Sequence, residues 1–308
     1  MSLRSLKLPT IDFINKRKYA MVFSALLLIV SIISLGLQGL KLGIDFTGGT
    51  LIEVGYQQTA DLEDIRTKLA SANYMGTNVQ YFGSDTEVLI QLEPQAISSA
   101  KLSSSIIQML GDGIDVRRVE FVGPKVGEEL TNDGGLALLY ALIGILIYVA
   151  FRFEYRFALG SITALIHDVI ITLGVFSILQ IAFDLTVLAA ILAVIGYSLN
   201  DTIVVFDRIR ENFLSTRHIE PVPIVNDALN QTLTRTLMTS LTTLIVLLAL
   251  FYLGGEVIHS FAGALIIGVV IGTYSSIFVA SSMILALGIS KEDMLPSEKE
   301  KKEIDARP

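Results

Sequence analysis

The sequence predicts a membrane protein, an all-α bundle of six transmembrane helices with a small α+β domain between the first two helices. Of the 308 residues, 52% are hydrophobic and only 17% are charged, a balance that soluble domains rarely have. Six apolar runs approach the roughly 20 residues that cross a bilayer. Between the first two runs, residues 41–133 have the composition and the short alternating segments of a soluble domain.

The expected spans follow from the apolar runs. Residues 1–18 are a basic N-terminal segment, and residues 19–40 supply a full-length first span. A basic start before an apolar run is also typical of a signal peptide, but this run is too long for one and five more spans follow, so we expect a retained helix. The other spans are expected at residues 134–151, 159–181, 185–206, 233–253 and 258–287, with a connection at 207–232 and a tail at 288–308.

Residues 41–133 alternate between strand and helix patterns. Strand-like runs at 50–57, 79–82, 87–92 and 116–122 enclose two amphipathic helical segments, 61–73 and 97–110. The resulting order β-α-β-β-α-β is that of the ferredoxin-like split motif, and the segment has the length of one small domain.

The basic residues predict the orientation. They lie in the N-terminal segment, in the connections near residues 152–156 and 207–232, and in the tail, whereas the connections near 182–184 and 254–256 have neither Lys nor Arg. Basic connections remain cytoplasmic, so both termini are expected in the cytoplasm and residues 41–133 on the opposite, external side.

Composition excludes several classes of function. The chain has no cysteine, which rules out disulfides, thiolate metal ligands and a cysteine nucleophile. Its three histidines are scattered without metal-binding spacing, so we expect no metal site. The formal charge of −7 gives no reason to expect nucleic acid binding. The GYSLND sequence around Asp201 lacks the glycine pattern of intramembrane aspartyl proteases, and we expect no enzymatic activity.

Ionisable residues inside the expected spans are the functional candidates. A carboxylate such as Asp201 costs a few kcal/mol in hydrocarbon. Asp201 lies about 9 Å along its helix from Asp207, and Arg235 enters the next, antiparallel span about 7 Å beyond Asn230. The similar depth predicts that Asp201 and Arg235 pair. The alternatives are a structural ion pair that never titrates and an arginine that snorkels to the headgroups.

Other polar residues could support this pair. A polar stripe beside Arg235 favours a face turned toward protein or water, and His167 with Asp168 lies on the third span, where simple hydrogen bonding between helices is the alternative. The expected supporting residues are Asn200, Thr232, Thr236, Thr239, His167 and Asp168.

Small residues mark two further features. Gly48–Gly49 and Gly134–Gly135 flank the inserted domain, and we predict that they act as hinges, with ordinary turn geometry as the alternative. In the last span, small residues recur every four positions and predict a tight helix–helix face: Ala264, Gly268, Gly272 and Ser276.

Five motifs together resemble the SecF family of the bacterial Sec protein-export machinery, part of the wider resistance-nodulation-division class. They are GIDFTGGT at 43–50, ALIHDVIITLG at 164–174, IGYSLNDTIVVFDRIREN at 195–212, LNQTLTRTLMTSLTTL at 229–244 and VIGTYSSIFVASS at 270–282. The resemblance implies a ferredoxin-like periplasmic domain, and it implies that Asp201 and Arg235 are the ion-coupling residues. No cofactor is implied; the coupling ion is expected to be H⁺, with Na⁺ as the alternative.

The resemblance also implies partners and a location. SecF-type chains lie in the bacterial inner membrane and join SecD, whose fourth span supplies another aspartate to the site. The complex associates with the SecYEG channel and YajC and drives a late stage of export of unfolded preprotein on the periplasmic side. Two alternatives remain open: a half-size transporter of a lipid or drug, and a scaffold of the translocase that couples no ion.

Overall fold

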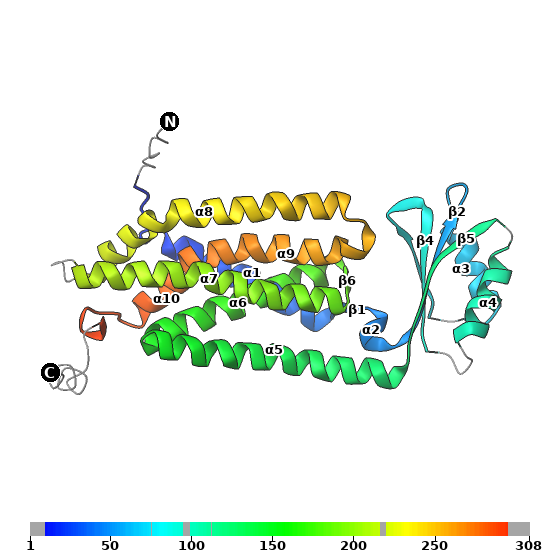
Figure 1. Ribbon diagram of the computed structural model, residues 1–308, viewed down its shortest axis with the longest axis horizontal. Helices are drawn as coiled ribbons and strands as arrows, with labels where there is room; N and C mark the ends of the chain where they lie inside the picture. Colours follow the sequence, from blue (N-terminus) through cyan, green and yellow to red (C-terminus); the bar gives the residue numbers. More distant parts are fainter. Residues whose placement is uncertain (1–9, 75, 95–98, 112, 216–219, 295–308) are drawn as a thin grey trace, which may run out of the picture.

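The computed structural model describes residues 10–74, 76–94, 99–111, 113–215 and 220–294. Six helical spans in this part of the chain are long and apolar enough to cross a membrane. They are α1 (Arg17–Leu37), α5 (Pro124–Arg152), α6 (Tyr155–Leu179), α7 (Leu185–Ser215), α8 (Pro221–Leu253), and a last span made of α9 (Glu256–Ser275), a π-helical turn (Ser276–Ala280) and α10 (Ser281–Ala286). Figure 1 shows these helices as one elongated bundle with the small domain beyond one end.

The spans divide into central and peripheral helices. In the most apolar stretch of each, 50% or more of the residues are buried in α6, α7 and the last span, but 17% or fewer in α1, α5 and α8. Aromatic side chains fill the middle: the rings of Phe157 and Phe206 lie 4.8 Å apart, and both side chains are fully buried. The peripheral helices therefore present most of their apolar surface outward, as expected where lipid or another protein covers them.

Three helices, α5, α7 and α8, extend beyond the spans expected from hydropathy. Helix α5 begins at Pro124 rather than at residue 134, with proline in the first turn where its missing N–H costs nothing. Gly134 and Gly135 therefore lie inside a helix and not in a turn. Helix α7 continues to Ser215 and α8 begins at Pro221, so most of the expected connection at 207–232 is helical. Polar residues in these extensions hid them from an apolar-run criterion.

The inserted domain has the element order that the pattern predicted. The elements are β2 (Gly49–Tyr56), α3 (Leu62–Ser71), β3 (Asn78–Phe82), β4 (Ser84–Leu92), α4 (Ser99–Leu110) and β5 (Ile114–Val122). The strands form one antiparallel sheet in the order β3-β4-β2-β5. Side chains from β2 and β4, among them Ile52 and Ile90, pack with Leu69 of α3 and Ile106 of α4 in a core separate from that of the bundle.

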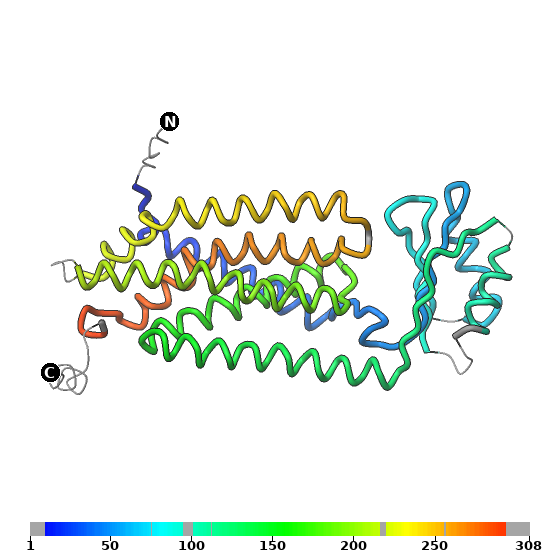
Figure 2. The backbone as a smooth tube through the Cα atoms, in the orientation of Figure 1, coloured from blue at the N-terminus to red at the C-terminus, as the bar shows by residue number. Residues whose placement is uncertain are grey.

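A short connector joins the bundle to this domain. Strand β1 (Lys41–Leu42) pairs in parallel with β6 (Ala182–Phe183), the segment between α6 and α7. Helix α2 (Ile44–Thr47) follows, and Gly48 and Gly49, with φ of 70° and 132°, lead into β2. In Figure 2 this segment and the start of α5 are the two chain passages between the bundle and the domain.

Candidate functional site

A hydrogen-bonded carboxylate lies at the centre of the bundle. Asp168 of α6 is fully buried, and its Oδ2 atom accepts hydrogen bonds from the hydroxyls of Ser198 on α7, at 2.6 Å, and Ser275 on α9, at 2.7 Å. Its Oδ1 atom lies 2.9 Å from Nδ1 of His167. Asp168 thus links the three central helices through hydrogen bonds.

His167 extends this cluster toward α1. Its ring is buried and stacks on that of Tyr274, with centroids 6.2 Å apart, and its Nε2 atom has no hydrogen-bond partner in the part of the chain that the structure describes. The Tyr274 hydroxyl donates to the Ala20 carbonyl of α1 at 2.7 Å and also contacts the Ser24 hydroxyl at 2.9 Å. The cluster around Asp168 therefore reaches four helices.

Asp201 lies one helical turn beyond Ser198 on α7, in a different environment. The residue is 3% exposed, and its Oδ2 atom is buried and accepts no hydrogen bond from any residue that the structure describes. A buried carboxylate is costly unless charges or donors compensate it. Among the described residues, no donor compensates the charge of the ionised carboxylate at Oδ2.

Arg235 is the predicted partner of Asp201, but the two side chains do not form the predicted ion pair. Arg235 lies on α8, the helix that follows α7, and no salt bridge between Arg235 and Asp201 occurs among the described residues. Arg235 is exposed on the surface of the isolated chain. The two residues lie on neighbouring helices, but Asp201 is buried and Arg235 is exposed.

The predicted supporting residues separate into two groups. Thr232 and Thr236 are buried on α8, and the Thr236 hydroxyl, like the Asp201 carboxylate, has no hydrogen-bond partner in the described part of the chain. Asn200 and Thr239 are exposed, and Thr239 donates to the Thr236 carbonyl at 2.9 Å. Asp201 on α7 and Thr236 on α8 are thus both buried, each with a side-chain oxygen that lacks a hydrogen-bond partner among the described residues.

The small residues of the last span bring α9 close to α7. A Cβ atom added at Gly268 would lie 2.1 Å from a Val194 methyl, and one at Gly272 would lie 3.0 Å from the Ser198 Cβ. Ala264 and Ser276 are fully buried on the same helix span. This contact holds Ser198 where it reaches Asp168, and Ser198 and Asp201 share one face of α7 at a spacing of three residues.

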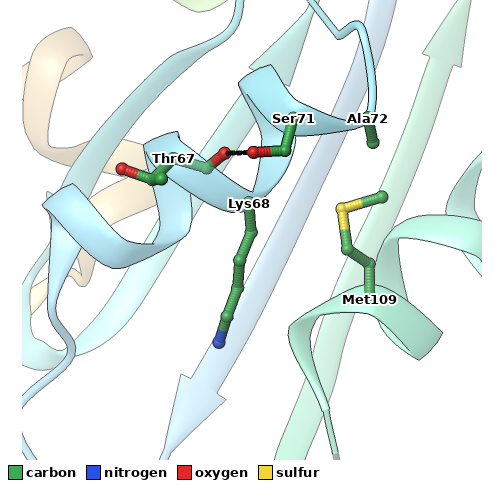
Figure 3. A pocket seen from close by; sticks show the side chains of 5 residues that line it. All are labelled: Thr67, Lys68, Ser71, Ala72 and Met109. Carbon is green, nitrogen blue, oxygen red and sulfur yellow. Dashed lines mark hydrogen bonds between the residues drawn. The ribbon is translucent and has the colours of Figure 1, made fainter.

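The inserted domain contains a pocket in which two of the lining polar side chains already have partners within the domain. An open pocket of about 350 Å³ lies between α3 and α4 of the domain, lined by Thr67, Lys68, Ser71, Ala72 and Met109 (Figure 3). Its Ser71 hydroxyl donates to the Thr67 carbonyl at 2.7 Å, and its Lys68 pairs with Asp64 at 2.7 Å. No group of three or more His, Asp or Glu side chains that could hold a metal occurs in the described ranges.

Ser198, Ser275 and Tyr274 were not singled out from the sequence. Serine is common in membrane helices, so a single serine does not indicate a site, and the sequence does not predict that Ser198 and Ser275 bind Asp168. The available signal was the clustering of Ser198 within GYSLND and of Tyr274 and Ser275 within GTYSS, two polar interruptions of otherwise apolar spans.

Fold and site together define a multi-pass membrane protein with ionisable side chains buried in its helix bundle. Residues 103–290 match the family model described as "Protein export membrane protein SecD/SecF, C-terminal", and residues 33–60 match the "SecD/SecF GG Motif". The chain belongs to the SecD/SecF family of protein-export membrane proteins.

Its relatives are translocase subunits of similar length. It is 54% identical to "Protein translocase subunit SecF" of Vibrio alginolyticus, covering 97% of both chains. With the protein of that name from Pseudomonas aeruginosa it is 45% identical, over 99% of this chain and 100% of the relative. These names describe a component of protein export.

A solved structure supports the same assignment. The chain resembles the crystal structure of SecDF from Thermus thermophilus, described as a translocon-associated membrane protein, with a TM-score of 0.85 and 37% identity. The match covers 92% of this chain and 39% of the SecDF chain, so this chain spans less than half of that longer protein.

Proposed function

We propose that this chain is the SecF-type half of an ion-driven protein-export complex. It joins SecD in the bacterial inner membrane and uses the transmembrane proton gradient to drive a late stage of preprotein translocation through SecYEG, with YajC as an associated protein. Both termini are cytoplasmic, and the inserted domain is a ferredoxin-like domain on the periplasmic side that meets the preprotein. Asp201 carries the proton.

The environment of Asp201 is the observation that carries this proposal. The carboxylate is buried, and its Oδ2 atom has no hydrogen-bond partner among the residues that the structure describes. A bound proton removes the cost of its charge. Binding the proton from one side and releasing it to the other converts the gradient into work, because each elementary charge crossing supplies about 2.3 kcal/mol per 100 mV. The helix packing must bind the proton with different affinity in two arrangements for that energy to be used.

Arg235 supplies the second charge of the coupling site. It lies on a peripheral helix, exposed in the isolated chain, where its guanidinium can face a partner bundle. SecD would cover this face and contribute its own aspartate. The SecDF neighbour is more than twice as long as the matched region, which is consistent with a second half outside this chain.

The test is export driven by an imposed proton gradient after ATP is exhausted, in vesicles that carry the full complex. Asp201→Asn keeps the shape of the side chain and removes its titration, so we expect export to fall to the level without a gradient. The matched control is Asp207→Asn, six positions further along α7 (207 − 201 = 6), where the carboxylate is partly exposed and pairs with Arg152 at 3.0 Å. Normal gradient-driven export in Asp201→Asn would refute the coupling role.

The remaining alternatives give different results in the same vesicles. A scaffold that couples no ion predicts unaltered export in Asp201→Asn with normal assembly. A half-size transporter predicts gradient-driven movement of a lipid or drug without SecYEG. Replacing the proton gradient by a sodium gradient distinguishes H⁺ from Na⁺ as the coupling ion.

A further inference from the structure

The connector between bundle and domain is attached to the outer end of α7. The Gly43 N–H donates to the Phe183 carbonyl at 2.8 Å, and the rings of Phe46 and Phe183 stack with centroids 5.7 Å apart. Two residues after Gly43 and Phe183 in the two segments, the Asp45 carboxylate accepts a hydrogen bond from the Leu185 N–H at 3.0 Å. Leu185 is the first residue of α7, so Asp45 binds the N-terminus of the helix that carries Asp201.

The opposite side of the connector is pressed against α5. A Cβ atom added at Gly127 would lie 2.8 Å from the Gly48 nitrogen and 2.9 Å from the Phe46 oxygen. The Thr131 hydroxyl lies 3.3 Å from the same Phe46 oxygen. Only a glycine at position 127 allows the two backbones to come this close.

The backbone of the connector is also closely packed where it enters the domain. A Cβ atom at Gly48 would lie 2.9 Å from Pro124 Cα, and one at Gly49 would lie 2.3 Å from the Leu92 carbonyl oxygen. Gly49 is the first residue of β2, which pairs with both β4 and β5. The glycines are needed here because neighbouring backbone leaves no room for a side chain, and the same close packing opposes free rotation about them.

We infer that residues 43–49 form a rigid strut that transmits movement of the outer end of α7 to strand β2 of the domain. Asp45 is the positioning residue that attaches this strut to α7. The inference rests on the proposed function, in which the movement starts at Asp201. Asp201 lies 16 positions after Leu185 (201 − 185 = 16), about 24 Å along the same helix. A strut replaces the pair of flexible hinges suggested by Gly48–Gly49 and Gly134–Gly135.

The Asp45 contact is not needed to cap α7. Asp184 already does so within the local sequence: its carboxylate accepts from the Val187 N–H at 2.9 Å and from the Thr186 hydroxyl at 2.6 Å. Asp45 reaches the same helix end from 140 positions away in the chain. Its distinctive contribution is therefore the fixed position of the connector relative to α7.

The first experiment compares Asp45→Ala with Asp184→Ala in vesicles that carry the full complex. Asp45→Ala removes the attachment and keeps the local cap, so we expect gradient-driven export to fall several-fold with normal assembly. Asp184→Ala removes the local cap and keeps the attachment, and export should remain near that of the parent. Parental export in Asp45→Ala, or equal losses in both variants, would overturn the strut.

A disulfide test keeps the inference falsifiable if Asp45→Ala does not fold. A Cβ atom at Gly43 would lie 3.2 Å from the Asp184 Cβ, close to the roughly 3.5–4.5 Å of disulfides. The chain has no cysteine of its own, so Gly43→Cys with Asp184→Cys forms one defined crosslink. If the connector is a rigid strut, complexes with the oxidised crosslink should export at least as well as reduced ones. When Asp45→Ala is combined with the two cysteines, oxidation should restore the export that Asp45→Ala removes. Loss of export on oxidation would show that the connector must swivel.

Asp201→Asn measured in parallel separates the two hypotheses. If gradient-driven export is lost in Asp201→Asn but is unaffected by Asp45→Ala and by the disulfide state, the strut is wrong and the coupling role stands. If export persists in Asp201→Asn, the proposed function itself fails.

Discussion

Two aspartates are buried in the same bundle, and their surroundings are opposite. Asp168 on α6 faces two serine hydroxyls and a histidine nitrogen. Asp201 on α7 is almost as deeply buried, yet its Oδ2 atom has no hydrogen-bond partner among the described residues. A carboxylate surrounded by donors holds helices together, whereas one without them is held at a cost and gains when its charge is removed.

The difference lies in stabilisation, because Asp168 has hydrogen-bond donors that Asp201 Oδ2 lacks among the described residues. Hydrogen bonds to a charged group contribute about 1.5–3 kcal/mol each, so the Asp168 cluster stabilises the contacts among α6, α7 and α9. The same helices carry Asp201 one turn away. A firmly held set of central helices can thus keep an energetically unfavourable carboxylate in place.

The largest expected effect comes from removing the acceptor of the structural cluster. Asp168→Ala leaves Ser198, Ser275 and His167 buried without it, and we expect the free energy of unfolding to fall by about 3–5 kcal/mol. Thermal unfolding of the purified chain in detergent measures this loss. Asp168→Asn retains one carbonyl acceptor and should lose less; equal losses in the two variants would argue against hydrogen bonding as the cause.

Removing single donors should have intermediate effects. Ser198→Ala and Ser275→Ala each delete one hydrogen bond to Asp168 Oδ2, with an expected loss of about 1.5–3 kcal/mol each. Because both hydroxyls bind the same oxygen, the double variant should not equal the sum of the single ones. Strict additivity in the same unfolding assay would indicate that the two serines act independently of Asp168.

The smallest effect is expected at Asp201, and with the opposite sign. Asp201→Leu replaces a buried carboxylate by an apolar group of similar volume, so the free energy of unfolding of the isolated chain should rise by about 1 kcal/mol. The control is Asp207→Leu further along α7, which removes only the partly exposed ion pair with Arg152 and should lower stability in detergent by no more than about 1 kcal/mol. A loss of stability in Asp201→Leu as large as that in Asp168→Ala would abolish the distinction between the two aspartates.

Much of the architecture could be predicted because it depends on local pattern. Apolar runs located six spans, and alternation located the strands and helices of the inserted domain. The start of α5 was missed because residues 124–133 are polar, although Pro124 is a good helix-start signal. Hydropathy detects a bilayer-crossing segment and not the helical turns that project beyond it.

The site could be predicted only in part, because pairing depends on helix rotation. Sequence position gave the depths of Asp201 and Arg235 but not the directions of their side chains, and the predicted ion pair is absent from the described residues. The Asp168 cluster joins residues from three helices far apart in the chain. No spacing rule within one helix reveals such a cluster.

The π-helical turn at Ser276–Ala280 determines which side of the end of the last span faces the neighbouring helices. It holds about one residue more than an α-helical turn, and that residue rotates everything after it by about 100°. In this orientation Ile284 is fully buried, and one of its methyl carbons would lie 2.8 Å from a Cβ added at Gly160 of α6. Deleting one residue between 276 and 280 would restore a continuous α-helix but turn Ile284 away from Gly160. The residue count of this span is therefore fixed by its fit to α6, and not by the thickness of the bilayer alone.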